Sequence, residues 1–334
     1  ESYLRIIEQS VTGSLFDELG AYETPASSTR STKNSTDRAM SVVPFDPKLR
    51  EEGHDFPVAG HTMVGHKRLQ NVRMALEAVV ADGIPGDFVE LGVWRGGVCI
   101  YARALLNLLG ATNRSVHLFD AFDLVPQVYG NGEGERYFAV SEEQVRHNFD
   151  KYGLLDESTI TFHKGLFEDS IPQYAQATDG PIAVLRIDTN GYAACRDTFA
   201  RLWHRVPVGG FVIFDDYGDQ PSARRCWSDF QAAKGFRAEV TPVDWTGAYM
   251  RKTQEAAQTR TSAEVSSAHV AMASDADRRF CPEEDENKGG LERALRALTR
   301  GLTIDVGSYD GTNALSYARA GHEVIAMEPS PSKR

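Results

Sequence analysis

The 334-residue sequence has few cysteines, no long apolar run and no surplus of positive charge. Its four cysteines (Cys99, Cys195, Cys226 and Cys281) form no CxxC pair, which argues against structural zinc and fits a reducing compartment. No apolar stretch approaches the roughly 20 residues of a membrane-spanning helix, and the N-terminus lacks a signal-peptide pattern. We therefore expect a cytoplasmic protein without a membrane partner.

The formal net charge is −11, and no stretch concentrates lysine and arginine. The electrostatic field of a chain with this negative charge repels polyanions, so nucleic acid is not an expected partner. With 41% hydrophobic and 25% charged residues, the chain can build one full core of roughly 200 to 250 residues and a smaller unit beside it.

Short apolar segments alternate with helical patterns in the middle of the chain. The expected strands span 86–93, 115–122, 159–165, 182–188 and 209–216, and the expected helices begin near 96, 141 and 191. Nearly continuous apolar strands separated by helices indicate a parallel sheet covered on both faces. The predicted fold class is α/β, with a doubly wound, mostly parallel, Rossmann-like sheet.

This fold is expected to fill residues 1–252, of which 1–84 form a helical and lid part with helices at 2–18 and 66–82. A polar linker at 253–290 follows, and 291–334 starts a second βαβ unit that stops after its second strand. The chain also begins without an initiator methionine. We expect a piece of a longer polypeptide, with a vestigial appendage as the alternative.

A glycine-bearing loop, ELGVWRGG at 90–97, falls at the carboxyl end of the first strand, where ligands bind in doubly wound sheets. Its order, Glu90-x-Gly92-x-x-x-Gly96, misses the GxGxxG of dinucleotide folds and resembles the first motif of S-adenosylmethionine-dependent methyltransferases. Gly92 and Gly96 would let the backbone approach the methionine part of the cofactor. Glu90 would meet its ammonium group, directly or through the loop. A turn without a ligand is the alternative.

The next two strand ends support an adenosine cofactor. Asp120 ends the strand VHLFD, where a carboxylate can accept hydrogen bonds from both ribose hydroxyls, as in nicotinamide-binding folds. The segment KGLFED at 164–169 places Gly165 and Phe167 beside the adenine.

Two adjacent carboxylates, Asp215 and Asp216, end the apolar run at 209–216. Burying an unpaired carboxylate is costly, so a cation, a basic partner or water must compensate them. The alternative is a strand that ends in solvent, with one aspartate capping the next turn.

Several long motifs in order resemble the macrocin O-methyltransferase family over about residues 2–252: GHTMVGHKRLQNV (60–72), GDFVELGVWRGG (86–97), VLRIDTNGY (184–192), VPVGGFVIFDDYGD (206–219) and VDWTGAYMRK (243–252). The resemblance implies a class I enzyme that depends on S-adenosyl-L-methionine and Mg²⁺. It implies a small hydroxylated acceptor, a sugar or a related secondary metabolite, and self-association into a homo-oligomer.

By this resemblance the metal ligands are Asp188, Asp215 and Asp216, and Thr62 and Met63 lie against the cofactor. Asp188 is the candidate general base. His147 and His163 are weaker candidates for this role, and His61 is expected to be structural or related to the lid. Asp215, at a strand end, is expected to be replaceable without loss of the fold.

The sequence departs from the family pattern after Asp188. Asn190 stands where the family has a second aspartate, which keeps an oxygen but loses a charge and would weaken metal binding. The loop at 128–138 is glycine-rich and polar, as a mobile lid would be. Cys195 is expected to be a buried thiol rather than a nucleophile.

The C-terminal segment resembles the opening of FkbM-type methyltransferases, on Asp305, Gly307, Gly311 and Glu328 followed by proline. Three functions stay open for the whole chain. The preferred one is a metal-dependent O-methyltransferase. A non-catalytic cofactor-binding or scaffold domain, motivated by Asn190, would bind the cofactor without turnover. An NAD-dependent oxidoreductase is disfavoured by the missing GxGxxG.

Overall fold

The structure is a computed structural model that describes residues 2–25, 38–124, 138–189, 191–253, 302–306 and 323–327. It divides into two compact units, Glu1–Thr259 and Arg260–Arg334, which are described separately. Asn190, Cys281, nearly all of the expected lid and linker, and the C-terminal motif residues Gly307, Gly311 and Glu328 lie outside the described residues.

The first unit is built on a seven-stranded sheet with the order β6-β5-β4-β7-β8-β10-β9. The strands are β4 (Asp87–Leu91), β5 (Val116–Asp120), β6 (Ile160–Lys164), β7 (Ile182–Ile187), β8 (Phe211–Phe214), β9 (Thr241–Pro242) and β10 (Ala248–Arg251). The five from β4 to β8 pair in parallel, whereas β10 runs antiparallel to β8 and to β9. The predicted doubly wound, mostly parallel α/β class is confirmed.

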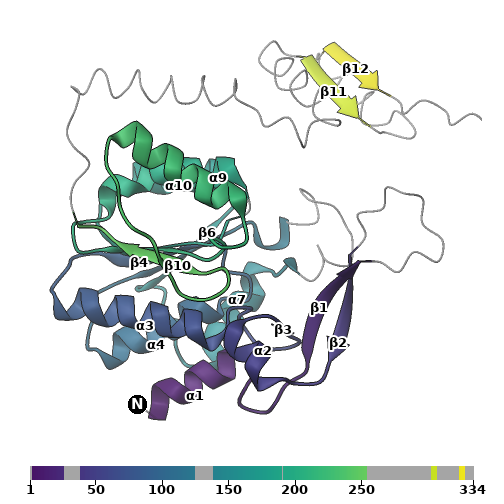
Figure 1. Cartoon of the computed structure of the whole chain (residues 1–334), viewed down its shortest axis with the longest axis vertical. Helices are drawn as coiled ribbons and strands as arrows, with labels where there is room; N and C mark the ends of the chain where they lie inside the picture. Colours follow the sequence, from purple (N-terminus) through teal and green to yellow (C-terminus); the bar gives the residue numbers. More distant parts are fainter. Residues whose placement is uncertain are drawn as a thin grey trace, which may run out of the picture. The chain divides into compact units, whose positions relative to one another are not determined.

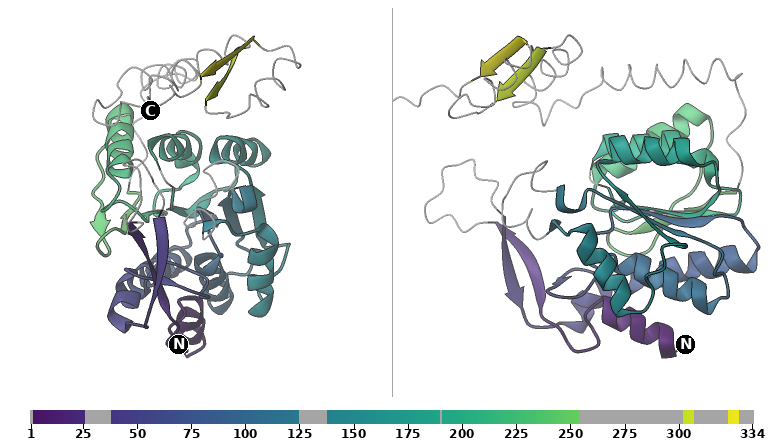
Figure 2. Two further views of the ribbon diagram at one scale, coloured as in Figure 1. Left: turned by 90° about the vertical axis from the view of Figure 1, so that its right-hand side faces the viewer. Right: turned by 180° about the vertical axis from the view of Figure 1, so that it is seen from behind.

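Helices cover both faces of this sheet (Figure 1). One face carries α3 (His66–Ala81), α4 (Gly97–Leu108) and α7 (Glu142–Lys151), and the other carries α8 (Phe167–Ala177), α9 (Tyr192–Leu202) and α10 (Pro221–Lys234). The sequence patterns did not predict α8 and α10. The further views show the same two layers of helices on either side of the strands (Figure 2).

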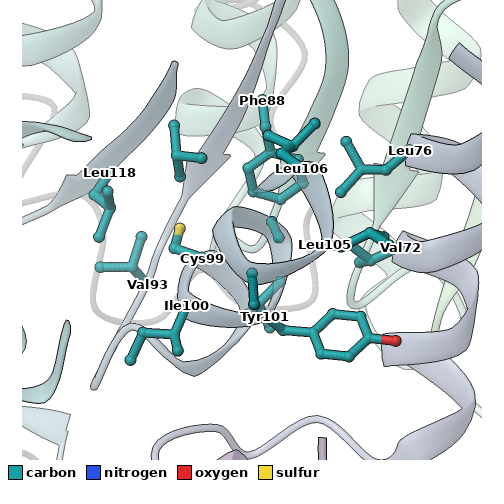
Figure 3. Packing of buried hydrophobic residues seen from close by; sticks show 14 of the residues in the cluster. Val72, Leu76, Phe88, Val93, Cys99, Ile100, Tyr101, Leu105, Leu106 and Leu118 are labelled. Atoms are coloured by element: carbon teal, nitrogen blue, oxygen red, sulfur yellow. The ribbon is translucent and has the colours of Figure 1, made fainter. Parts of the chain in front are cut away.

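The core beneath α4 explains why this helix is mostly apolar. Each of its residues from Gly97 to Leu106 is buried, because the helix lies between the sheet and helices α1 (Ser2–Val11) and α3. Figure 3 shows Cys99, Leu105 and Leu106 of α4 packed with Phe88 of the sheet. Because α4 is buried along most of its length, its position is fixed by packing. Its first residue, Gly97, is also the last residue of the glycine loop, so the end of that loop is fixed as well.

The N-terminal part is less helical than expected. Helix α1 ends at Val11, since Gly13 takes a left-handed conformation with φ of 72°. Strands β1 (Gly20–Pro25), β2 (Arg38–Val43) and β3 (Phe56–Pro57) then form a small antiparallel sheet, and α2 (Pro47–Glu52) lies between β2 and β3. The sequence patterns did not predict these three strands or α2.

Two short 3₁₀ turns complete the first unit, η1 (Phe122–Leu124) after β5 and η2 (Trp203–Arg205) after α9. In the second unit the described residues form β11 (Leu302–Val306) and β12 (Glu323–Met327), which pair in parallel. They coincide with the two strands that the sequence predicts for the start of a second βαβ unit. Among the described helices of the chain, none has the length and apolarity needed to cross a membrane.

The aromatic core on the α9 face should dominate the stability of the sheet. Phe199 is 1% exposed and packs against Phe214, Trp227 and Phe230. We expect Phe199→Ala to lower the free energy of unfolding by about 3 to 5 kcal/mol, because truncation leaves a cavity. Urea denaturation followed by fluorescence checks this value.

Phe16→Ala is the matched control, since Phe16 is 88% exposed. The same substitution there should change the free energy of unfolding by no more than about 0.5 kcal/mol. Equal effects at the two positions would contradict the packing described here.

Candidate functional site

The ends of the central strands bring the predicted site residues to one edge of the sheet. The backbone N–H of Asp188 bonds Leu91 at the end of β4, and that of Asp215 bonds Ile187 at the end of β7. The N–H of Gly92 bonds Phe119 in β5. These bonds continue the parallel ladders beyond the strands, so the loops after β4, β7 and β8 start from fixed positions.

Asp188, Asp215 and Asp216 converge as the sequence predicts. One carboxylate oxygen from each lies within 4.8 Å of those of the other two. Asp188 keeps 33% of its side chain exposed, whereas Asp215 keeps only 7%. The cluster is thus open to a ligand on the Asp188 side.

Asp215 is enclosed by two arginines. Its Oδ2 accepts a hydrogen bond of 2.7 Å from Arg68, and its Oδ1 accepts one from Arg186. These contacts argue against the expectation that Asp215 can be replaced without loss of the fold, because its carboxylate is buried in ion pairs rather than standing free at a strand end. Removing one partner of a buried ion pair leaves an uncompensated charge, which lowers the free energy of unfolding by about 3 to 5 kcal/mol.

The electrostatics of the cluster favour a cation. Burial and the neighbouring Asp215 raise the pKa of Asp188 well above its usual range and that of Asp216 to about 7. Burial alone would raise the pKa of Asp215 too, but Arg186 and Arg68 hold it below its ordinary value. Within the described residues, the carboxylate of Asp216 accepts no hydrogen bond. Oδ2 of Asp188 accepts two hydrogen bonds of 3.3 Å from Arg186, but this guanidinium is shared with Glu90 and Asp215. Negative charge therefore exceeds positive charge here, and oxygen ligands of this kind suit a hard divalent ion.

Glu90 lies under the glycine loop rather than in it. Its side chain is 2% exposed, with Oε1 bonded to Arg186 and Oε2 accepting from the thiol of Cys99 at 2.7 Å. Burial raises the pKa of Glu90, although Arg186 opposes this. Glu90 was expected to meet the ammonium group of the cofactor either directly or through the loop. Because both of its carboxylate oxygens already have partners, the arrangement favours an effect through the loop.

The glycines of the loop are needed for internal packing. Gly92 has φ of 86°, and a side chain there would collide with the carbonyl of Asp188. A side chain at Gly96 would lie 2.7 Å from Val145 of α7. Between them Trp94 has φ of 48°, a left-handed conformation that is rare for an aromatic residue. The loop is therefore pressed against both the acidic cluster and α7.

Asp120 organises the same loop from the end of β5. Its Oδ2 accepts hydrogen bonds from the backbone N–H groups of Val93 and Trp94, and its Oδ1 accepts one from Phe122. Burial raises the pKa of Asp120 in spite of these bonds. A carboxylate has about four lone-pair sites, so ribose hydroxyls could still be accepted.

The remaining predicted cofactor residues border the loop. Thr62 is buried, and its hydroxyl accepts a hydrogen bond from Val64. Met63 packs against the core on the same side. Gly165 bonds the carbonyl of Asp120, and Phe167 starts α8. Thr62 thus lies beside Gly97 at the start of α4, and Gly165 and Phe167 follow the carboxyl end of β6.

A cavity of about 770 Å³ adjoins this region. Its lining includes His61, Arg95, Asp123 and Asn148, together with Val140 and Lys151. The volume lies within the range of small-molecule sites, about 300 to 1,000 Å³. Asp123, in the turn that follows Asp120, and Arg95 of the glycine loop both line the cavity.

The histidines take structural positions. His61 bonds the hydroxyl of Tyr152 at 3.0 Å, and burial lowers its pKa to about 4. His163 stacks on Phe119 and bonds His117, with its pKa likewise lowered by burial to about 4. His147 is exposed on α7. None of the three bonds the acidic cluster.

Cys195 is buried, as expected, beside the thiol of Cys226 on α10. Three further residues, Arg68, Arg186 and Asp244, belong to the cluster but were not found from the sequence. A signal existed only for Arg186, which interrupts the apolar run of β7 and so needs a buried partner.

Comparison with known proteins agrees with this geometry. The sequence profile of macrocin-O-methyltransferase (TylF) matches residues 1–252. A demethyldecarbamoylnovobiocin O-methyltransferase of Streptomyces niveus is 39% identical over 220 residues, covering 63% of this chain and 82% of its own. A tetracenomycin-C-rhamnosyl 4'-O-methyltransferase of Streptomyces olivaceus is 40% identical over 230 residues, covering 66% and 85%.

Among solved structures, the O-methyltransferase NovP superposes with a TM-score of 0.64 at 33% identity. The match covers 76% of this chain and 99% of that one. The profile match extends over the whole sheet and every strand end described above. The chain therefore belongs to the macrocin O-methyltransferase family and is an S-adenosylmethionine-dependent O-methyltransferase.

Proposed function

We propose that this enzyme requires a divalent cation, Mg²⁺ in the first instance, and that it methylates a hydroxyl of a sugar or a related secondary metabolite. The observation that carries the cation requirement is the convergence of Asp188, Asp215 and Asp216 within 4.8 Å. Five carboxylates meet here, those of Glu90, Asp188, Asp215, Asp216 and Asp244, against the guanidinium groups of Arg68 and Arg186. A cation fits this imbalance of charge.

The aspartates would hold the ion at the sheet edge, with Asp188 and Asp216 as the open ligands and Asp215 fixed behind them. A bound divalent ion lowers the pKa of a hydroxyl, which is otherwise far above neutral. Asp188 is our candidate for the general base, because a third of its side chain is exposed while Asp215 is enclosed. The glycine loop and Asp120 would orient the methyl donor for an in-line displacement, in which proximity and orientation supply most of the rate.

The acceptor class follows from the relatives. One is named for a rhamnosyl-bearing tetracenomycin and another, from Micromonospora griseorubida, for mycinamicin III. The open side of the cluster is compatible with a small hydroxylated molecule. A non-catalytic cofactor-binding domain and an oxidoreductase are less favoured, since the matching family model and the similar proteins are named as O-methyltransferases.

Chelation should separate cofactor binding from turnover. We expect EDTA to abolish formation of S-adenosylhomocysteine with a panel of glycoside acceptors, and Mg²⁺ to restore it. S-adenosylmethionine should still bind to the chelated protein in calorimetry, because its predicted contacts lie in the glycine loop. Full turnover after exhaustive chelation would contradict the cation requirement, and binding without turnover on any acceptor would favour a non-catalytic domain.

Replacing one open ligand should weaken metal-dependent activity without loss of the fold. Asp216→Asn is expected to lower kcat/KM by about 100-fold, as losses at metal sites commonly do. Its thermal midpoint should stay the same or rise, because the substitution removes a negative charge beside Asp215. Steady-state kinetics measures the change in kcat/KM, and scanning calorimetry measures the thermal midpoint.

Asp219→Asn serves as the control for this variant. Asp219 is exposed in the same loop and lies outside the cluster. Its substitution should leave kcat/KM within about twofold of the parent, in line with surface changes elsewhere. A similar loss in both variants would show that the loop, and not the ligand, is responsible.

A further inference from the structure

Arg68 connects the acidic cluster to a turn far along the chain. It lies in the first turns of α3 with 8% of its side chain exposed. Its terminal nitrogen donates to Oδ2 of Asp215 at 2.7 Å, and its Nε donates to Oδ2 of Asp244 at 2.9 Å. Asp244 belongs to the turn between β9 and β10.

Asp244 is itself held in place. Its side chain is 1% exposed, and its Oδ1 accepts from the backbone N–H groups of Thr246 and Gly247. A side chain at Gly247 would meet the aliphatic part of Arg68 at 2.8 Å. The turn therefore fixes both the end and the stem of the arginine.

Arg186 holds the opposite oxygen of Asp215 from β7. The two arginines together fix both oxygens of this carboxylate, which leaves it no freedom to rotate. Of the two arginines, Arg68 connects Asp215 to a segment outside the central strands, the turn that holds Asp244. The described partners of Arg186 stand at the ends of β4, β7 and β8.

We infer that Arg68 is a positioning residue, which orients Asp215 for cation binding by bridging it to the Asp244 turn. This inference rests on the proposed cation requirement. It goes beyond it, because it makes the β9–β10 turn and the start of α3 part of the cation site. The planar fork of arginine is needed, since one nitrogen faces Asp215 while another faces Asp244.

The rival explanation is that Arg68 only balances charge. The two roles predict effects of opposite sign. If Arg68 only balances charge, its positive guanidinium repels the bound cation, and a substitution that removes this charge should tighten cation binding. A positioning residue should weaken binding when it is lost, and also when its charge is kept but its geometry is changed.

The test measures Mn²⁺ binding by electron paramagnetic resonance, with the full chain and without cofactor or acceptor. Arg68→Lys keeps the charge but offers a single nitrogen, and Arg68→Gln removes the charge. We expect both variants to bind Mn²⁺ at least about tenfold more weakly than the parent, in the range typical of altered metal surroundings. Circular dichroism confirms folding, and either folded variant suffices for the comparison.

Lys67→Gln is the matched control, because Lys67 is the adjacent residue, is 41% exposed and pairs with Glu52 rather than with the cluster. It should bind Mn²⁺ like the parent. Unchanged or tighter Mn²⁺ binding by Arg68→Lys or Arg68→Gln would overturn the positioning role of Arg68 and leave the proposed cation requirement standing. Absence of Mn²⁺ binding in the parent chain would overturn the cation requirement and this inference with it.

Discussion

Two arginines hold the carboxylate of Asp215 from opposite sides, and the rest of the strand-end site is arranged around this pairing. Each charge would be costly to bury alone, and each is buried here only because the next one compensates it. The chain of contacts runs from Asp244 through Arg68, Asp215 and Arg186 to Glu90. Asp188 and Asp216, at its margin, are left with an excess of negative charge.

The register of the parallel strands explains why these charges meet. Glu90 stands opposite Arg186 in the pairing of β4 with β7, and Asp215 follows directly after β8 on the same face. This face is the one that α3 and α4 cover, so Arg68 of α3 and Cys99 of α4 can reach into the row. A shift of one residue would turn Glu90 and Arg186 toward the aromatic core on the other face.

Periodicity and motif spacing predicted the parts of the site that are local. The apolar pattern located Asp215 and Asp216 at the carboxyl end of a strand, and the family resemblance added Asp188. Parallel pairing makes residues at neighbouring strand ends meet. Arg68 and Asp244 could not be found in this way, because Arg68 contacts Asp215 across 147 residues of sequence and Asp244 contacts Arg68 across 176. The small N-terminal sheet was missed for a similar reason, since β3 pairs with β1 although β2 and α2 lie between them in the sequence.

The N-terminal segment is part of the frame of the site rather than only a lid. Val11, at the end of α1, accepts hydrogen bonds from the backbone N–H groups of His61 and Thr62. The carbonyl of His61 in turn accepts one from Gly97, where α4 begins beside the glycine loop. Moving this segment away would leave these buried groups unpaired and would also take Arg68 from Asp215. The family match includes the N-terminal helix together with the sheet.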